Sequence, residues 1–223
     1  MSTSERPWPC VMPCSAAPEV VVIGISPGNS PRKEDRGCET RYTAGAPPTF
    51  GEPPDFGYPD TKHYWAKVRS LCCHLVRRAD RKMSENDCIA LSSHLNLGTG
   101  QAGQASMKDT DPPLIRWVST LLNKFFQPHL IVLFGLNRIL RDRSVDWNHR
   151  DGLQVDWHQP HFFSRFDRYQ FRLWNADSAK GNRTGVLMWP NHPSRPPFAG
   201  SEKTAEWTRA LKEASKFLKE HGF

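Results

Sequence analysis

Two short polar motifs in this sequence carry side chains that could act on a bound substrate. Residues 26–30 (Ser-Pro-Gly-Asn-Ser) follow an apolar run, and their backbone N–H groups could bind a phosphate or position a water molecule. Residues 191–197 (Asn-His-Pro-Ser-Arg-Pro-Pro) place a histidine, a serine and an arginine among prolines. Because proline restricts the backbone, these polar groups are held in place before a substrate binds.

Each motif also has a purely structural interpretation. Pro27 and Gly28 could serve only to set the dihedral angles of a turn. A lone histidine such as His192 is more often structural than catalytic. The first motif lacks the Gly-Lys-Ser/Thr of a phosphate-binding P-loop and contains no G-x-G-x-x-G. The position of His192 directly after an apolar run favours the functional interpretation.

The apolar pattern predicts the elements that position these motifs. Continuous apolar runs predict buried strands, and apolar residues at helical spacing predict amphipathic helices. Residues 169–174 alternate and predict an edge strand or a hairpin arm. The predicted buried strands are residues 19–25, 88–92, 129–134 and 185–189, and the predicted helices are residues 61–79, 114–126, 136–141 and 201–221, the last with Ser201 as its N-cap.

Strands that alternate with helices predict an α/β fold, with three α/β/α layers and a four-stranded, mainly parallel sheet. In such a sheet the ligand site lies beyond the carboxyl ends of the strands. The segments at those ends are residues 26–30, 92–98, 135–138 and 190–198. Both polar motifs are among them, so we expect the chemistry at this edge.

The composition is that of a globular protein. The chain has 223 residues, 38% hydrophobic and 24% charged, and predicts one domain (residues 19–223) after a flexible N-terminal arm (residues 1–18). Its apolar runs are far shorter than the ~18 residues of a membrane span, so we expect no membrane partner. Six cysteines, with Cys72 and Cys73 adjacent, favour a reduced, cytoplasmic protein. Their spacing predicts neither a metal site nor a cofactor.

The order of the two motifs resembles that of the uracil-DNA glycosylase superfamily. Its members carry Gly-x-Asn/Asp-Pro-Gly/Tyr after the first strand and His-Pro-Ser after the fourth. Here residues 24–28 (Gly-Ile-Ser-Pro-Gly) and residues 192–194 (His-Pro-Ser) are similar to these motifs, and residues 128–135 resemble the signature of the third strand. The resemblance covers most of residues 19–223. It implies the family's fold and a monofunctional DNA glycosylase, which removes a base and leaves an abasic site.

The resemblance implies roles for particular residues. His192 would donate a hydrogen bond to O2 of the departing pyrimidine, and loss of such a donor typically costs about 10²–10³ in rate. Gly28 would contact the substrate. The target base must leave the duplex and stack on an aromatic side chain. The loop that follows the first motif offers four candidates for this partner: Tyr42, Phe50, Phe56 and Tyr58.

The first motif departs from the family pattern at the position that handles water. Most members have Asn or Asp where this chain has Ser26, which is a poorer water activator at neutral pH. Asn29, Glu34 or Asp35 could take over this role. We therefore expect Ser26 and Asn29 to be catalytic together with His192.

The second departure concerns the base. Uracil-specific members present an asparagine amide at the end of the second strand, where this chain offers Ser93, His94 or Asn96. Because a site built for one hydrogen-bond pattern rejects another, we expect a modified or damaged pyrimidine as substrate. Such an activity would serve DNA repair or defence against phage with modified bases. Two alternatives are a uracil-DNA glycosylase of base-excision repair and a catalytically silent DNA-binding relative.

Basic residues follow three of the predicted strands. The net charge of +7 (30 Lys and Arg against 23 Asp and Glu) permits a DNA partner, duplex or single-stranded. Arg195 occupies the position where the family inserts a wedge into the gap left by the flipped base, although a phosphate contact is an alternative. We expect a monomer that binds DNA through Arg32, Lys33, Arg138, Ser194 and Arg195.

Overall fold

A computed structural model of the chain describes residues 10–13, 17–24, 61–76, 83–97, 110–166, 169–179, 181–193, 195–201 and 203–223. The strands are β1 (Cys10–Pro13), β2 (Val20–Gly24), β3 (Ser92–Asn96), β4 (Leu130–Phe134), β5 (Phe162–Phe166), β6 (Tyr169–Asp177) and β7 (Arg183–Trp189). The helices are α1 (Thr61–Leu75), α2 (Glu85–Ala90), α3 (Pro112–Thr120), the π-helix η3 (Leu121–Phe126), α4 (Asn137–Asp142), α5 (Ser144–Trp147) and α6 (Ala205–Glu220).

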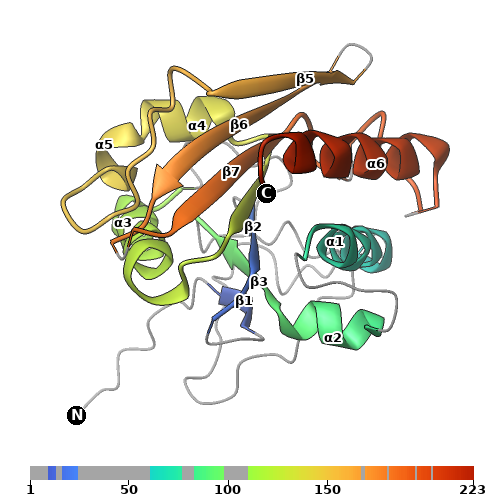
Figure 1. Cartoon of the computed structure of the whole chain (residues 1–223), viewed down its shortest axis with the longest axis horizontal. Helices are drawn as coiled ribbons and strands as arrows, with labels where there is room; N and C mark the ends of the chain where they lie inside the picture. Colours follow the sequence, from blue (N-terminus) through green and yellow to red (C-terminus); the bar gives the residue numbers. More distant parts are fainter. Residues whose placement is uncertain are drawn as a thin grey trace, which may run out of the picture.

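All described strands belong to one twisted sheet, in the order β1-β3-β2-β4-β7-β6-β5 (Figure 1). Strands β3, β2, β4 and β7 are parallel to one another, whereas β1, β6 and β5 pair antiparallel at the two sides. The α/β class is therefore confirmed, but the predicted four-stranded sheet is wrong, because the sheet is mixed and has seven strands.

The additional strands lie in segments with weak sequence signals. Strand β1 has only four residues, one of them proline, and lies within the predicted N-terminal arm, where it pairs with β3. Strand β6 includes residues 169–174, whose alternation predicted an edge strand or a hairpin arm, and its hairpin with β5 confirms this prediction. Pairing with an existing sheet stabilises a short strand such as β1, and this is a long-range effect that local patterning does not reveal.

The second predicted strand, residues 88–92, is wrong. The chain forms α2 there, and the strand β3 begins only at Ser92. A local cap explains the helix: the backbone N–H and the hydroxyl of Ser84 both donate to the Asp87 carboxylate, and the N–H of Asp87 donates to Ser84 Oγ. This reciprocal capping satisfies backbone donors at the start of α2. The segment expected as a polar loop is therefore a buried strand.

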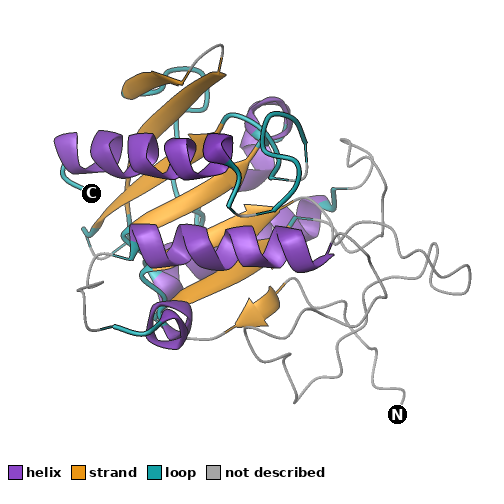
Figure 2. Ribbon diagram, turned by 90° about the vertical axis from the view of Figure 1, so that its right-hand side faces the viewer, coloured by secondary structure: helices purple, strands orange, loops and turns teal. Residues whose placement is uncertain are grey.

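Helices cover both faces of the sheet. Helices α1 and α6 run side by side across one face (Figure 2), and their apolar residues pack on β2, β4 and β7 around Trp189 and Trp207. Helices α3, η3, α4 and α5 cover the other face around Trp147 and Trp174. Within the described part of the chain, no helix is both long and apolar enough to cross a membrane.

The predicted helices are present with two changes. The segment 114–126 divides into α3 and η3, and the N–H of Gln127 bonds to Leu122 O at the end of the π-helix. Helix α6 is capped by Thr204, whose side chain accepts from the N–H of Trp207, so the predicted N-cap Ser201 is wrong. Gly222 follows α6 with φ 82°, a conformation that favours glycine at a helix C-terminus.

Candidate active site

The four parallel strands end side by side at one edge of the sheet. Gly24 pairs in register with Asn96, and Phe134 pairs with Trp189. Two backbone hydrogen bonds continue this edge, one from the N–H of Leu97 to Gly24 O (3.1 Å) and one from the N–H of Gly135 to Trp189 O (3.2 Å). The loop after β7 begins here; we call residues 190–193 and 195–198 the His192 loop.

His192 is half-buried between aromatic rings from two elements. Its imidazole stacks on Tyr64 of α1, with ring centres 5.3 Å apart and planes at 5°, and meets the edge of Phe134 of β4 at 6.2 Å. Burial, with smaller effects of the Arg195 and Lys67 cations, lowers the pKa of His192 to about 4. The imidazole is therefore neutral near pH 7 and can donate a hydrogen bond through one ring nitrogen.

Lys67 of α1 fixes the backbone of the His192 loop. Its side chain is 1% exposed. The Nζ donates to Pro193 O at 2.8 Å and to Phe198 O. Inside the loop, the N–H of Arg195 donates to His192 O (2.9 Å) and the N–H of Phe198 to Arg195 O (2.8 Å). One buried ammonium thus bonds to two points of the His192 loop, one of them directly after His192.

A buried histidine, His94, contacts the hydroxyl end of Tyr64. His94 of β3 has its Nε2 2.7 Å from the Tyr64 hydroxyl. Burial, with a smaller effect of His192, lowers the pKa of His94 to about 3, and burial raises the pKa of Tyr64. Both side chains are neutral near pH 7, so one hydrogen bond joins a phenol and an imidazole. Tyr64 therefore links His94 and His192.

Asn96 ends β3 beside Gly24. It is 5% exposed, and its Oδ1 has no hydrogen-bond partner among the described residues. A Cβ on Gly24 would lie 2.9 Å from this oxygen and 3.5 Å from Cε1 of His94, so only glycine fits beside the amide without displacement. An unpaired buried acceptor is costly unless a ligand satisfies it. Asn96 can accept an N–H at the edge where β2 continues toward Ser26.

The structure brings some of the predicted residues together. His94, Asn96 and His192 belong to the same edge. Ser93 does not join them: it pairs with Val21, whose side chain lies in the core on the opposite face of the sheet. Its hydroxyl is buried there and has no partner among the described residues.

The predicted DNA-binding arginines that the structure describes are exposed. Arg195 lies in the His192 loop, and Arg138 of α4 has a side chain that is 86% exposed and 3.9 Å from Asp142. The remaining predicted residues lie outside the described part of the chain: Ser26, Gly28, Asn29, Arg32, Lys33, Tyr42, Phe50 and Ser194, together with the alternatives Glu34, Asp35, Phe56 and Tyr58.

Sequence reasoning missed Tyr64, Lys67 and Phe134. Tyr64 and Lys67 are three positions apart in α1 and share its buried face with Val68 and Leu71. A lysine within an apolar helical stripe was the available signal, because lysine is almost never fully buried unless its ammonium is bonded. Phe134 is the last residue of a buried strand and gave no such signal.

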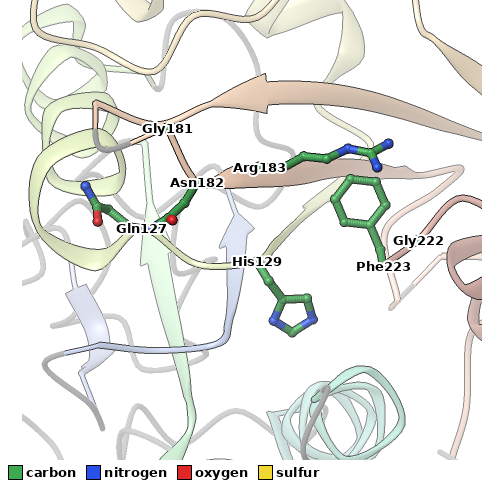
Figure 3. A pocket seen from close by; sticks show the side chains of 7 residues that line it. All are labelled: Gln127, His129, Gly181, Asn182, Arg183, Gly222 and Phe223. Atoms are coloured by element: carbon green, nitrogen blue, oxygen red, sulfur yellow. The ribbon is translucent and has the colours of Figure 1, made fainter.

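Two cavities lined by described residues lie at the opposite, amino-terminal edge of the parallel strands. One, of about 350 Å³, is lined by Gln127, His129, Gly181, Asn182, Arg183, Gly222 and Phe223 (Figure 3). The other, of about 960 Å³, lies between the ends of α1 and α6 and shares His129 and Phe223 with the first. Neither is lined by His192 or its neighbours. The described residues contain no cluster of three or more His, Cys, Asp or Glu that could hold a metal ion.

Comparisons with protein-family models, with curated proteins and with solved structures found no significant match to this chain.

Proposed function

We propose that this protein is a DNA glycosylase that hydrolyses the N-glycosidic bond of a modified or damaged pyrimidine flipped out of DNA. One observation carries the proposal: a neutral histidine, His192, is held beside the carboxyl ends of four parallel strands by Tyr64 and Lys67. Ligands of open α/β sheets bind at this edge. The exposed Arg195 in the same loop suits a polyanionic substrate.

The chemistry requires a hydrogen-bond donor for the departing base. As the bond between N1 and C1′ breaks, its electron pair stays on the base, and negative charge builds on O2. His192 donates a ring N–H toward that oxygen, and a water molecule adds to C1′ and loses a proton to solvent, while the departing base anion takes up a proton from solvent. A neutral imidazole suits this role, because it stabilises the charge without first giving up a proton. Ser26 or Asn29 orients the water.

The edge of the base faces the end of β3. The unpaired Oδ1 of Asn96 accepts an N–H of the pyrimidine, which recovers the free energy lost by burying this oxygen. Gly24 leaves room for the amide, and the buried His94 lies next to it. Base discrimination therefore depends on which substituents fit beside Asn96 and His94.

A panel of duplexes tests the proposal. Oligonucleotides with uracil, hydroxymethylated cytosine or glucosylated cytosine are incubated with the protein, and abasic sites are then cleaved with alkali. We expect scission of at least one modified duplex by the wild-type protein and loss of scission in His192→Ala. Scission of the uracil duplex alone would indicate a uracil-DNA glycosylase. Salt-sensitive binding without scission on any duplex would indicate a catalytically silent DNA-binding relative.

A further inference from the structure

Lys67 of the neighbouring helix α1 bonds to the His192 loop at two points. Its Nζ reaches the carbonyl of Pro193, which follows His192 directly, and the carbonyl of Phe198 at the end of the loop. The Lys67 ammonium also lies 5.8 Å from the centre of the Trp207 ring in α6. A buried cation with these contacts restrains the loop backbone more strongly than the turn's own hydrogen bonds can, because charged donors form the stronger bonds.

Tyr64 restrains the ring of His192 rather than its backbone. The planes of the two rings are almost parallel, at 5°, and the Tyr64 ring also makes an edge contact with Phe134, with ring centres 6.3 Å apart. The hydrogen bond between the Tyr64 hydroxyl and His94 ties the far end of the phenol to β3. Tyr64 and Lys67 are three residues apart on α1, so one helix face supplies both restraints.

We propose that Tyr64 and Lys67 are positioning residues that hold His192 in a single orientation at the strand ends, Lys67 through the loop backbone and Tyr64 through the imidazole ring. The expected effect on rate rests on the proposed function, whereas the orientation of His192 does not. Misplacing a catalytic group by about 1 Å can cost about 10² in rate, so a loosened loop would slow the reaction while substrate still binds.

The same contacts affect the charge of His192. The titratable or charged described residues that face it are Tyr64 and Lys67 from α1, His94 from β3 and Arg195 from its own loop; β4 contributes only Phe134. Both cations disfavour protonation of the imidazole. Removal of Lys67 is therefore expected to raise the pKa of His192 above about 4, although burial, the largest cause, still keeps it below 6.5.

The central variant is Lys67→Met, which keeps an unbranched apolar stem and removes the ammonium. We expect the single-turnover rate to fall by about 10–10²-fold, whereas the dissociation constant for DNA changes by less than about threefold. Lys67→Arg keeps charged donors and is expected to recover part of the rate. Lys212→Met, at an exposed position in the middle of α6 that lines the cavity of about 960 Å³, is the control and should match the wild type.

Arg195→Gln separates charge from restraint. This substitution also removes a cation near His192, but it leaves the bonds of Lys67 to the loop intact. We expect it to raise the pKa of His192 as Lys67→Met does, and to weaken DNA binding, while the NMR resonances of His192 in the protein without DNA stay single. Equal broadening of these resonances in the two variants would show that Lys67 acts through charge alone and would overturn its positioning role.

Two variants of Tyr64 test the ring contact. Tyr64→Phe keeps the stack and removes the bond to His94, so the rate is expected to fall less than about threefold. Tyr64→Leu removes the stack, and we expect a fall of about 10-fold or more with DNA affinity retained. If Tyr64→Leu is folded and has the wild-type rate, Tyr64 does not position His192.

NMR of the protein without DNA tests the orientation of His192 independently of any catalytic activity. In the wild type we expect contacts between the ring protons of Tyr64 and His192, one sharp set of His192 resonances, and a low pKa for this ring. Lys67→Met, or Tyr64→Leu where the former does not fold, should broaden or split these resonances. Absent ring contacts in the wild type would overturn the inference. A held His192 with no scission on any duplex would instead overturn the proposed function alone.

Discussion

At the carboxyl-terminal edge of the parallel strands, His192 stacks on the ring of Tyr64, His94 is hydrogen-bonded to its hydroxyl, and the Lys67 ammonium is bonded within the interior. At the amino-terminal edge, His129 instead lines two open cavities with exposed lysines of α6, Lys212 among them. Both edges thus have histidine and lysine side chains. At the carboxyl-terminal edge, these side chains bond to another side chain and to loop carbonyls, whereas the lysines of α6 at the other edge are exposed.

The comparison shows that cavity volume and functional potential need not coincide in this fold. The amino-terminal edge holds a cavity of about 960 Å³ whose lining includes exposed lysines of α6. At the carboxyl-terminal edge the polar groups are desolvated, which shifts the pKa values of both histidines and Tyr64. Perturbed titratable groups that contact each other are a feature of functional sites.

The largest expected effect is a loss of reaction rate, and one substitution at each edge of the sheet tests it. His192→Ala is expected to lower the single-turnover rate by about 10²–10³-fold, because it removes the donor to the departing base, and to leave DNA affinity nearly unchanged. His129→Ala at the other edge serves as the matched control and should retain the wild-type rate. Quench-flow or gel assays of abasic-site formation measure both. An equal loss in the two variants would mean that folding, rather than the edge, explains it.

The second prediction concerns DNA affinity. Arg195→Gln and Arg138→Gln are each expected to weaken binding and to reduce the slope of log K against log salt by about 0.9, as expected for one lost phosphate contact on duplex DNA. Lys212→Gln and Lys219→Gln, on the amino-terminal side, should leave the slope unchanged. Fluorescence anisotropy at several salt concentrations measures these slopes. A smaller salt slope in the lysine variants alone would show that DNA binds at the amino-terminal edge, which would contradict the proposal.

The third prediction is a dependence of stability on pH. His94 has a pKa lowered from 6.5 to about 3 in the folded protein, chiefly by burial, so below pH 6.5 the unfolded chain binds a proton that the folded protein does not. The stability contribution of neutral His94 is complete above pH 6.5 and is lost as the pH falls toward 3. We expect the free energy of unfolding, measured with denaturant, to fall more steeply with decreasing pH in the wild type than in His94→Gln. The difference in slope is at most about 1.4 kcal/mol per pH unit. Parallel curves would exclude a buried neutral His94.

The smallest effect comes from adding one methyl group at each edge. In Gly24→Ala the new Cβ would lie 2.9 Å from Oδ1 of the buried Asn96, and in Gly185→Ala 2.8 Å from the ring of Phe223. Phe223 is partly exposed and can move, whereas Asn96 is enclosed. We expect Gly24→Ala to lose about 1–2 kcal/mol of unfolding free energy and Gly185→Ala less than about 1 kcal/mol. Thermal unfolding measures both, and a reversed order would indicate that Asn96 can rotate freely.

The sequence was sufficient where the signal is local. The apolar runs around residues 20–24, 130–134 and 185–189 predicted three of the parallel strands, and helical spacing predicted α1, α3 and α6. The rule that ligands bind at the carboxyl ends of strands then selected His192 as a candidate site residue from the sequence alone. It also selected the segment that contains His94 and Asn96, although the strand itself was placed four residues too early.

Other features depended on contacts between distant segments. A strand as polar as Ser-Ser-His-Leu-Asn is buried only because β1, β2 and α1 surround it, and its alternation separates Ser93 from His94 and Asn96. The role of Lys67 could not be read from its neighbours in the chain, because its partners Pro193 and Phe198 are more than a hundred residues away.

The sequence by itself therefore determined the α/β class, most of the central elements and the edge where polar groups gather, since periodicity and turn residues act over a few positions. The tertiary structure decided which side chains at that edge touch, which face Ser93 occupies, and that His94 and His192 are neutral near pH 7. Desolvation and the proximity of charges arise only when segments far apart in the chain pack together, and these effects set the pKa values and the geometry of the site.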